Sequence, residues 1–316
     1  MPSSPSLELA TFTPHSALLA LKSSVQRIEL CSQRTHDGLT PSVQDYLFIT
    51  STLSPAHQEK PQTQTKTQTN TEDTTHTNTP NPSINQSISE KINIMIRPPP
   101  LNLNLNLNPL SNSNSNPHTN NFLIPAPTFE KMKQEIREFK KLGGRGFVFG
   151  ILKEEEEEDL HSHKGEGKKG KRNLIIDQER CRELLKIARE GEDRESVRCT
   201  FHRAFDRIDR ERMGEQLEVL INLSFTSLLT SGGSPTSTQG KLQIKTLVHQ
   251  ASGRIEIIVG GGVRSHNLKE LIDETGAQWF HSSAVTGEGE EVDGEEVRRL
   301  REIMCTYGAG SVGNLL

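Results

Sequence analysis

Polar and sulfur-containing side chains recur in short β-branched and aromatic segments of this chain. Glu29 and Cys31 lie two residues apart in one such segment, and Met95 and Arg97 lie two apart in another. Because successive side chains of a strand point to opposite faces, each pair is expected to share one face. A carboxylate and a guanidinium in a folded interior are costly unless they are paired. The pattern therefore predicts either a functional site or a satisfied ion network, such as Glu29 with Arg97.

Two histidines occupy comparable positions. His202 lies in Thr200-Phe-His-Arg-Ala-Phe-Asp206, and His281 lies in Trp279-Phe-His-Ser-Ser283. Imidazoles and carboxylates are the usual general acids and bases of enzymes, and a guanidinium is suited to clamping an anion. The candidate catalytic residues are therefore Glu29, Arg97, His202, Arg203, Asp206 and His281.

Soft metal ligands are found in the same segments. Cu(I) prefers thiolate and thioether sulfur and accepts imidazole, which makes Cys31, Met95 and His202 the candidate metal ligands. A lone buried cysteine also occurs simply as a small apolar residue, and this alternative stays open. Only 4 cysteines in 316 residues argue against a disulfide framework, and none of them forms a Cys-x-x-Cys pair, so a reducing compartment is favoured.

Two glycine clusters follow predicted strands, in Thr230-Ser-Gly-Gly233 and in Gly260-Gly-Gly-Val263. Backbone amides of such loops, next to helix N-termini, suit anions. The alternative is a pair of tight turns that need positive φ angles. The glycine spacing is not that of a dinucleotide fingerprint. The candidate anion-binding residues are Ser231, Gly232, Gly233, Gly260, Gly261 and Gly262.

Strand and helix patterns alternate along the chain. Strands are predicted at 7–12, 27–31, 92–96, 146–150, 197–201, 227–230, 255–259 and 278–282, and helices at 14–23, 42–53, 128–142, 177–189, 210–222, 238–250, 265–274 and 294–307. Thr40 and Pro41 predict the N-terminus of the second helix. Eight strands, each followed by a helix, favour an α/β fold of the (β/α)8 TIM-barrel type, which takes about 250 residues. A doubly wound open sheet is the alternative.

Three biased tracts interrupt this alternation, and they explain why apolar residues make up only 32% of the chain. Residues 54–91 and 98–121 are rich in Thr, Asn, Ser and Pro, and residues 153–173 form a charged run. Such compositions do not bury enough apolar surface to offset the entropy of ordering, so disordered insertions are expected. The chain (1–316) is then a single barrel domain. The second and third tracts join strands to helices, which places them on the face where barrel active sites form. They are either lids over that face or insertions without a function.

Charge and hydropathy narrow the classes of partner. The 37 basic and 41 acidic residues give a net charge of −4, without the clustered positive charge that nucleic acids or membrane surfaces attract. No stretch approaches the roughly 20 apolar residues of a membrane helix, and the N-terminus lacks a basic region before an apolar core. These features predict a soluble, intracellular protein that binds neither nucleic acid nor membranes.

Several strings together resemble the CutC copper homeostasis protein family. They occur in the family's order, and they are Arg27-Ile-Glu-Leu-Cys-Ser32, Gly38-Leu-Thr-Pro-Ser42, Met95-Ile-Arg-Pro98, Phe147-Val-Phe-Gly150, Thr200-Phe-His-Arg-Ala-Phe-Asp206, Leu229-Thr-Ser-Gly-Gly233, Gly260-Gly-Gly-Val263 and His281-Ser-Ser283. The resemblance covers nearly everything outside the biased tracts. It implies a TIM barrel, a cytoplasmic location and a role in copper homeostasis with copper binding, Cu(I) being favoured by the soft ligands.

The chain departs from the family pattern at two places. The family commonly carries Glu-x-Cys on its first strand, where this chain has Glu8-Leu-Ala10. Family members also usually continue Met-Ile-Arg-Pro with Arg, Gly-Gly and Asp, and here Pro98-Pro-Pro100 and a Leu/Asn repeat follow. If copper needed both thiols, this chain would bind it weakly or through other ligands such as Met95 or His202.

Two functions are compatible with these residues. The first is a copper-handling protein, with Cys31 as the soft ligand. The second is a TIM-barrel enzyme for a small anionic metabolite, with Glu29 or His202 as acid or base and Arg97 or Arg203 as anion clamp. The expected partner is accordingly a copper ion or a small-molecule ligand, and self-association into a homo-oligomer is left open.

Overall fold

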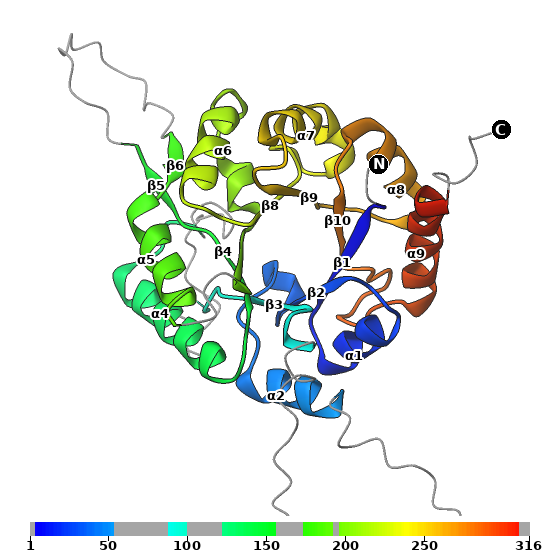
Figure 1. Cartoon of the computed structure of the whole chain (residues 1–316), viewed down its shortest axis with the longest axis horizontal. Helices are drawn as coiled ribbons and strands as arrows, with labels where there is room; N and C mark the ends of the chain where they lie inside the picture. The colour runs from blue at the N-terminus through cyan, green and yellow to red at the C-terminus, as the bar shows by residue number, and fades with distance from the viewer. Residues whose placement is uncertain (1–3, 54–87, 100–121, 156–172, 192–195, 310–316) are drawn as a thin grey trace, which may run out of the picture.

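Eight parallel strands close into a barrel in the computed structural model, which describes residues 4–53, 88–99, 122–155, 173–191 and 196–309 (Figure 1). The order around the barrel is β1-β10-β9-β8-β7-β4-β3-β2, and β2 pairs back onto β1. The helices lie outside the strands. The predicted (β/α)8 barrel is thereby confirmed. The open doubly wound alternative is wrong because both edges of the sheet are paired with each other.

The barrel strands are short, and each predicted strand is present. They are β1 (Ser6–Thr11), β2 (Arg27–Leu30), β3 (Ile92–Met95), β4 (Gly146–Phe149), β7 (Arg198–Phe201), β8 (Ser227–Thr230), β9 (Glu256–Val259) and β10 (Trp279–Ser282).

The eight predicted helices are also present, with ends that differ by a few residues. They are α1 (Pro14–Lys22), α2 (Val43–Thr52), α4 (Ala126–Lys141), α5 (Gln178–Ala188), α6 (Met213–Asn222), α7 (Ser237–Ala251), α8 (Ser265–Thr275) and α9 (Gly294–Ala309). Within the described residues, no helix combines the length and apolarity needed to cross a bilayer.

The predicted N-terminus of α2 is corrected by two residues. Ser42, not Thr40, caps the helix, because its hydroxyl accepts the Asp45 amide at 3.0 Å. The hydroxyl of Thr40 instead accepts the amide of Arg97 at 2.9 Å and donates to the carboxylate of Glu135 at 2.7 Å. Thr40 thereby fixes the backbone at Arg97, one of the candidate site residues.

One element escaped the sequence-based prediction. β5 (Leu152–Glu154) and β6 (Leu174–Ile176) form a two-stranded antiparallel sheet outside the barrel, at the two ends of the charged run that was predicted to be a loop. The charged composition of the run predicted a loop, and the short apolar segments on either side of it were therefore not recognised as strands. Residues 54–87, 100–121 and 156–172, which hold most of the predicted insertions, lie outside the described residues, so disorder there stays a prediction.

The two faces of the strands differ in chemistry. The outward faces carry fully buried apolar side chains such as Leu9, Ile28 and Phe147, which pack with apolar side chains of the helices in one continuous core. Burial of a large apolar side chain contributes about 1.5–3 kcal/mol, so this layer holds the helices on the barrel. The inward faces carry buried polar residues, among them Glu8 and Glu29. The interior of the barrel is therefore where the candidate polar residues meet.

A glycine in β4 sets how closely two strands approach, and it supports a stability prediction. A Cβ on Gly146 would lie 2.6 Å from the carbonyl oxygen of Ile92 and would also collide with the side chain of Asn93. We expect Gly146→Ala to lower the free energy of unfolding by about 1–3 kcal/mol in urea denaturation, because β3 and β4 must separate. Gly287→Ala is the matched control, since nothing lies within 4 Å of its added methyl group. An unchanged midpoint for Gly146→Ala would contradict the prediction.

Candidate functional site

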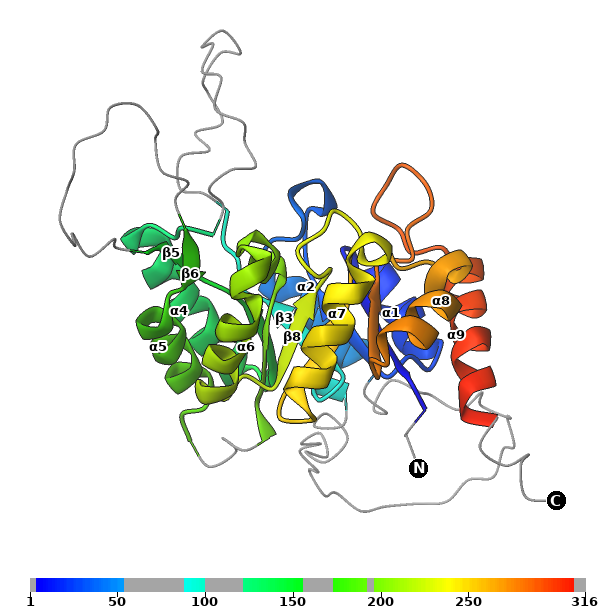
Figure 2. The ribbon, with the colours of Figure 1, turned by 90° about the horizontal axis from the view of Figure 1, so that it is seen from above.

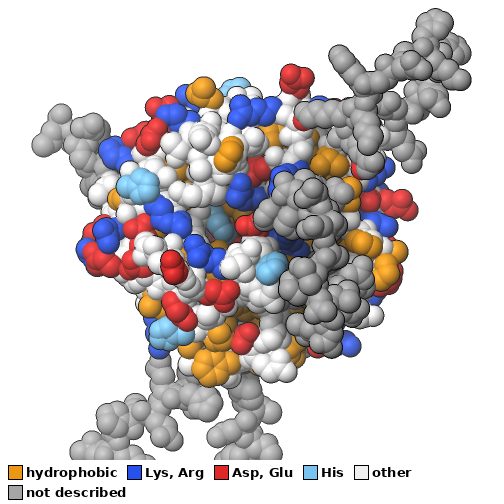
Figure 3. All heavy atoms as spheres, turned by 180° about the vertical axis from the view of Figure 1, so that it is seen from behind, with side chains coloured by type: hydrophobic (Ala, Val, Ile, Leu, Met, Phe, Trp, Pro, Cys, Tyr) orange, Lys and Arg blue, Asp and Glu red, His pale blue; other side chains and the backbone are white. Residues whose placement is uncertain are grey.

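The loops that follow the strands meet at one end of the barrel, where the loops after β2 and β10 rise side by side in Figure 2. A cavity of about 840 Å³ opens there. Figure 3 views this end, and Lys and Arg side chains lie around its central hollow. The cavity is lined by all the candidate catalytic and metal-binding residues, namely Glu29, Cys31, Met95, Arg97, His202, Arg203, Asp206 and His281. The barrel thus brings together residues from segments that are far apart in the sequence.

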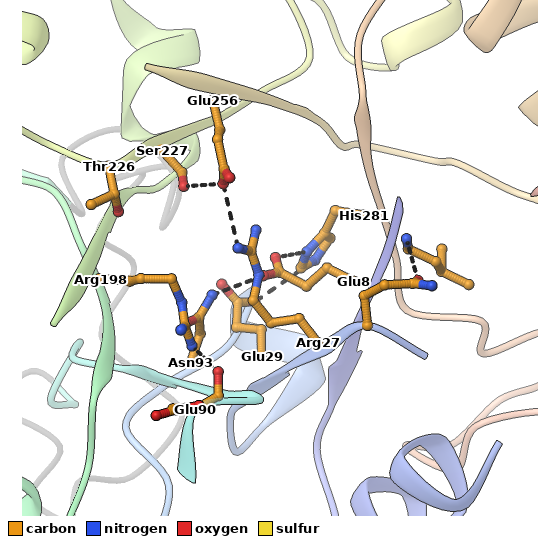
Figure 4. Close-up of polar contacts among 12 residues, drawn as sticks. Glu8, Arg27, Glu29, Glu90, Asn93, Arg198, Thr226, Ser227, Glu256 and His281 are labelled. Atoms are coloured by element: carbon orange, nitrogen blue, oxygen red, sulfur yellow. Dashed lines mark hydrogen bonds and ion pairs between the residues drawn. The ribbon is translucent and has the colours of Figure 1, made fainter. Parts of the chain in front are cut away.

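The floor of the cavity rests on a buried carboxylate, Glu8 of β1 (Figure 4). One oxygen, Oε1, lies 2.8 Å from Nδ1 of His281. The other, Oε2, accepts from Nε of Arg27 at 2.5 Å and from Nδ2 of Asn93 at 2.8 Å. Burial alone would raise the pKa of Glu8, but the charge of Arg27 and the contacts with His281 outweigh burial and lower the pKa to about 2. Glu8 is therefore ionised, and it fixes the orientation of the His281 ring.

The second nitrogen of His281 faces Glu29, with Nε2 at 3.7 Å from Oε2. Burial raises the pKa of Glu29, and the charge of Glu8 adds to this effect. Burial opposes protonation of His281, but the carboxylates of Glu29 and Glu8 outweigh it, so the pKa of His281 is raised. Oε1 of Glu29 is buried and, among the described residues, contacts no hydrogen-bond partner. Glu29 and His281 therefore form an acid–base pair with an unused acceptor at the cavity floor.

A layer of paired groups closes the barrel below this floor. The guanidinium of Arg27 lies 3.8 Å from the centre of the Trp279 ring, and its Nη1 lies 3.4 Å from Glu256. Arg198 donates to Oδ1 of Asn93 at 3.3 Å. The sequence predicted either a functional site or an ion network that includes Glu29. An ion network is present, but it is formed around Glu8 rather than Glu29.

The expected pairing of Glu29 with Arg97 does not occur. Nη1 of Arg97 donates to the carbonyl oxygen of His36 at 3.0 Å, and its guanidinium lies 5.1 Å from the centre of the Phe122 ring. Burial lowers the pKa of Arg97. The pairing fails because Arg97 extends past the end of β3 to the loop that follows β2, whereas Glu29 faces His281.

Two of the three candidate soft ligands, Cys31 and Met95, lie together, and the third, His202, makes different contacts. Cys31 and Met95 belong to one small buried cluster with Val148, and a Cβ on Gly38 would lie 3.2 Å from Sγ of Cys31 and 3.7 Å from Cε of Met95. Sγ of Cys31 donates to Oε2 of Glu29 at 3.4 Å. Burial raises the pKa of the Cys31 thiol well above its usual range, and the negative charge of Glu29 raises it further.

His202 lines the same cavity but makes different contacts. Its ring packs edge-on against Phe122, with 5.1 Å between ring centres, and its Nδ1 accepts the amide of Ala204 at 3.3 Å. Burial lowers the pKa of His202 to about 3, and the nearby charge of Arg97 acts in the same direction. The imidazole is therefore neutral, the form in which it binds metals. Within the described ranges, no three or more His, Cys, Asp or Glu side chains are arranged to hold a metal ion.

The glycine loop after β8 is already engaged by an anion of the protein itself. The carboxylate of Asp206 accepts the amide of Ser231 at 3.0 Å, the amide of Gly233 at 3.1 Å and the hydroxyl of Thr230 at 2.5 Å. Arg203 completes this arrangement, with its Nε at 2.8 Å from Oδ2 of Asp206. Asp206 therefore positions Arg203 and the loop, and it occupies two of the amides that were predicted to receive an external anion, those of Ser231 and Gly233.

The two glycine clusters also contain backbone turns that favour glycine. The φ angles are +69° at Gly232, +66° at Gly233, +94° at Gly261 and +83° at Gly262. The prediction of tight turns is thus confirmed at these four positions. Gly233, Gly261 and Gly262 line the cavity, whereas Ser231, Gly232 and Gly260 lie behind its wall.

The sequence-based prediction missed Arg264, which lies beside the turn at Gly261 and Gly262. Its Nη1 donates to the hydroxyl of Ser282 at 3.2 Å, and its Nη2 donates to the hydroxyl of Ser283 at 3.1 Å. The residue directly follows Gly260-Gly-Gly-Val263, so its position after a glycine-rich turn at a strand end was the available signal. Arg34 and Arg207 also line the cavity and were also missed.

Comparison with known proteins gives a consistent result. The CutC family model matches residues 167–286. A copper homeostasis protein cutC homolog of Homo sapiens is 36% identical over 168 residues, which cover 53% of this chain and 52% of that protein. A family protein CutC of Pasteurella multocida (strain Pm70) is 31% identical over 191 residues, covering 56% of this chain and 68% of that protein. The aligned part of the chain spans about half the length of the first curated relatives.

Among solved structures, the crystal structure of the putative copper homeostasis protein CutC from Streptococcus agalactiae superposes with a TM-score of 0.57 at 23% sequence identity. The match covers 88% of this chain and 98% of that chain. At this level of identity the similarity concerns the fold, and it agrees with the closed barrel described above.

Proposed function

Since the chain belongs to the CutC family, we propose that it acts in copper homeostasis, the role named for its relatives in Homo sapiens and Mus musculus, by binding Cu(I) in the cytoplasm at the mouth of the barrel. One observation carries the proposal: the thiol of Cys31 and the thioether of Met95 lie in one small cluster on the cavity wall. Sulfur ligands of these two kinds are the ones that select Cu(I).

The proton on Cys31 is central to how such a site would work. A thiol binds copper as the thiolate, and burial with the adjacent Glu29 carboxylate raises the pKa of Cys31. Copper must therefore displace the thiol proton. Glu29 is placed to receive it, because its Oε2 lies 3.4 Å from Sγ and its own pKa is raised by burial. The thiolate then neutralises the charge of Cu(I), the protonated Glu29 is neutral, and no unpaired charge is added to the buried wall.

The proposal is tested by an anaerobic titration of the protein with Cu(I) in competition with a chromogenic Cu(I) chelator. We expect one Cu(I) per chain, with an apparent affinity that falls as the pH is lowered, because protons compete with copper for the thiolate. Protein that takes no copper from the chelator at any ratio would overturn the proposal.

Ala10 offers a gain-of-function test of the same site. It is buried in β1, lines the cavity, and stands in register with Glu29 of the adjacent strand. We expect Ala10→Cys to tighten Cu(I) binding about tenfold or more, because it adds a second thiol to the wall that holds Cys31. The measurement is the same chelator competition, with Ala20→Cys, a buried position on α1 away from the cavity, as the matched control. Equal tightening in both variants would contradict the prediction.

A further inference from the structure

The cavity carries an excess of positive charge that copper binding does not explain. Among the residues that the structure describes, its lining contains five arginines and three acidic residues, although the whole chain has a net charge of −4. Copper binding at Cys31 and Met95 gives these arginines no role, because a guanidinium is a cation and does not bind a metal ion. The arginines are Arg34, Arg97, Arg203, Arg207 and Arg264, and the acidic residues are Glu29, Asp37 and Asp206.

Within the described part of the chain, the hydrogen bonds of two of these arginines are made only with neutral groups. All four contacts of the Arg264 guanidinium are with carbonyl or hydroxyl oxygens, those of Val263, Val285, Ser282 and Ser283. The nearby carboxylate of Glu296 is itself taken up by the amide and the hydroxyl of Ser265, at 2.7 Å each. Arg264 is thus a partly buried cation whose charge no contacting group neutralises, which is costly without an anion.

Arg97 is in the same situation on the other side of the barrel. Its Nη1 contacts three loop carbonyl oxygens, and its guanidinium lies over the ring of Phe122. Arg97 follows β3 and Arg264 follows β9, and these strands are four places apart in a ring of eight. The two cations therefore lie on opposite walls of the cavity.

The wall at Arg264 has further features that suit an anion. A Cβ on Gly261 would lie 3.2 Å from Cζ of Arg203, so only a glycine lets this second guanidinium lie against the backbone. Gly262 and Ser283 line the same wall. These loops follow β9 and β10, the seventh and eighth strands of the barrel along the chain, where barrels frequently bind phosphate groups.

The floor between the two walls offers polar contacts of another kind. Oε1 of Glu29 has no hydrogen-bond partner among the described residues and can accept from a ligand. The ring of His281 is held by Glu8 with its Nε2 toward Glu29. An inorganic anion without a proton, such as sulfate, would leave the Glu29 oxygen unsatisfied, since it has no hydrogen-bond donor. A molecule that carries both an anionic group and a hydroxyl or protonated amine would satisfy it.

We propose that the cavity binds a small organic molecule with an oxyanion group, held by Arg203 and Arg264 at the Gly261–Gly262 turn, and a hydrogen-bond donor that contacts Glu29. Arg97 and Phe122 contact the opposite end of this molecule. The oxyanion is a phosphate or a carboxylate, since a guanidinium recognises both through paired N–H donors. This site goes beyond copper binding: it shares Glu29 with the copper proposal, and its other residues are different ones in the same cavity.

The test is calorimetric titration of the copper-free protein, kept copper-free by a Cu(I) chelator, with glycerol 3-phosphate and with glycerate. Each probe carries one oxyanion group and hydroxyl groups, and glycerol serves as the neutral control. We expect at least one of the two anions to bind at millimolar concentration and glycerol not to bind. Binding of the phosphate ester alone or of the carboxylate alone identifies the oxyanion that the site takes. If neither anion binds, the proposal is overturned.

Substitution of the arginines tests which wall holds the anion. We expect Arg264→Gln to weaken binding by about tenfold or more, since charge-assisted hydrogen bonds to the oxyanion are lost, and Arg97→Gln to weaken it less, since only a contact with the uncharged end is lost. Arg254→Gln is the matched control: this arginine is paired with Glu218 in an ion pair at 2.8 Å and lies outside the cavity lining. Unchanged affinity in both cavity variants, or an equal loss in Arg254→Gln, would overturn the proposal. Should Arg264→Gln not fold, Arg97→Gln decides, because the guanidinium of Arg97 contacts loop carbonyl oxygens and the ring of Phe122 rather than the buried ion network of the floor.

The same variants separate this site from the copper site. Cys31→Ala is expected to keep its affinity for glycerol 3-phosphate or glycerate, whereas Arg264→Gln is expected to keep its affinity for Cu(I). Failure of copper binding therefore leaves the oxyanion site standing, and failure of oxyanion binding leaves the copper proposal standing.

Discussion

Replacement of Cys31 by alanine is expected to abolish tight Cu(I) binding. The variant removes the one thiol that lines the cavity in the described residues and leaves Met95 with a neutral thioether, which cannot compensate the charge of Cu(I). We expect the apparent affinity in chelator competition to fall by roughly 100-fold or more, or about 2.7 kcal/mol in binding free energy. Met95→Leu, which keeps the thiol and the volume, is expected to show a smaller loss.

The matched control for this variant is Cys305→Ala. Cys305 is exposed on α9 and lies outside the cavity lining, so its removal tests nonspecific thiol binding. Equal loss of copper in the two variants would show that copper binds to thiols without regard to the cavity. Full retention of copper by Cys31→Ala would remove Cys31 from the site.

Glu8→Gln is expected to be the most destabilising polar substitution at the barrel floor. The amide keeps the shape of Glu8 but removes the charge that Arg27 contacts at 2.5 Å, leaving Arg27 with the more distant Glu256 at 3.4 Å. Removing one partner of a buried ion pair costs roughly 3–5 kcal/mol, because the other charge stays buried and uncompensated. Urea denaturation at neutral pH measures this loss.

The pH dependence of stability provides a second measurement on the same residue. The folded-state pKa of Glu8 is lowered to about 2, below the value of about 4.3 expected in the unfolded chain. Its contribution to stability is therefore fully present above the unfolded-state pKa and is lost as the pH falls toward 2. Glu8→Gln should lack this acid-dependent loss. It should also lower the pKa of His281, which NMR titration of the ring resolves, because one of its two carboxylate partners is gone.

Glu218→Gln is the control that separates burial from ion pairing. Hydrogen bonds from Arg254 and Gln250 lower the pKa of Glu218 to about 2 as well, but this carboxylate lies at the surface. An exposed ion pair is screened by water, so little change in unfolding free energy is expected. Equal destabilisation by Glu8→Gln and Glu218→Gln would contradict the view that burial makes the Glu8 contacts strong.

The sequence by itself determined the elements and the direction of their side chains. Alternation along a strand depends only on local backbone geometry, so it correctly placed Glu29 with Cys31 and Met95 with Arg97 on the inward faces. The count of eight strand–helix units likewise predicted the barrel. The short β5–β6 hairpin was missed because its strands flank a charged run whose composition predicts a loop.

Only the tertiary structure decided which inward residues are partners. Glu8 and His281 are 273 positions apart, and they meet because β1 and β10 pair when the barrel closes. The sequence suggested that Glu29 pairs with Arg97. In the folded barrel, Glu29 instead contacts His281, and Arg97 donates to loop carbonyl oxygens. Which side chains contact each other depends on the register between strands and on the paths of the loops across the barrel mouth. Both are set by contacts between segments that are distant in the sequence, and a local sequence pattern does not predict such contacts.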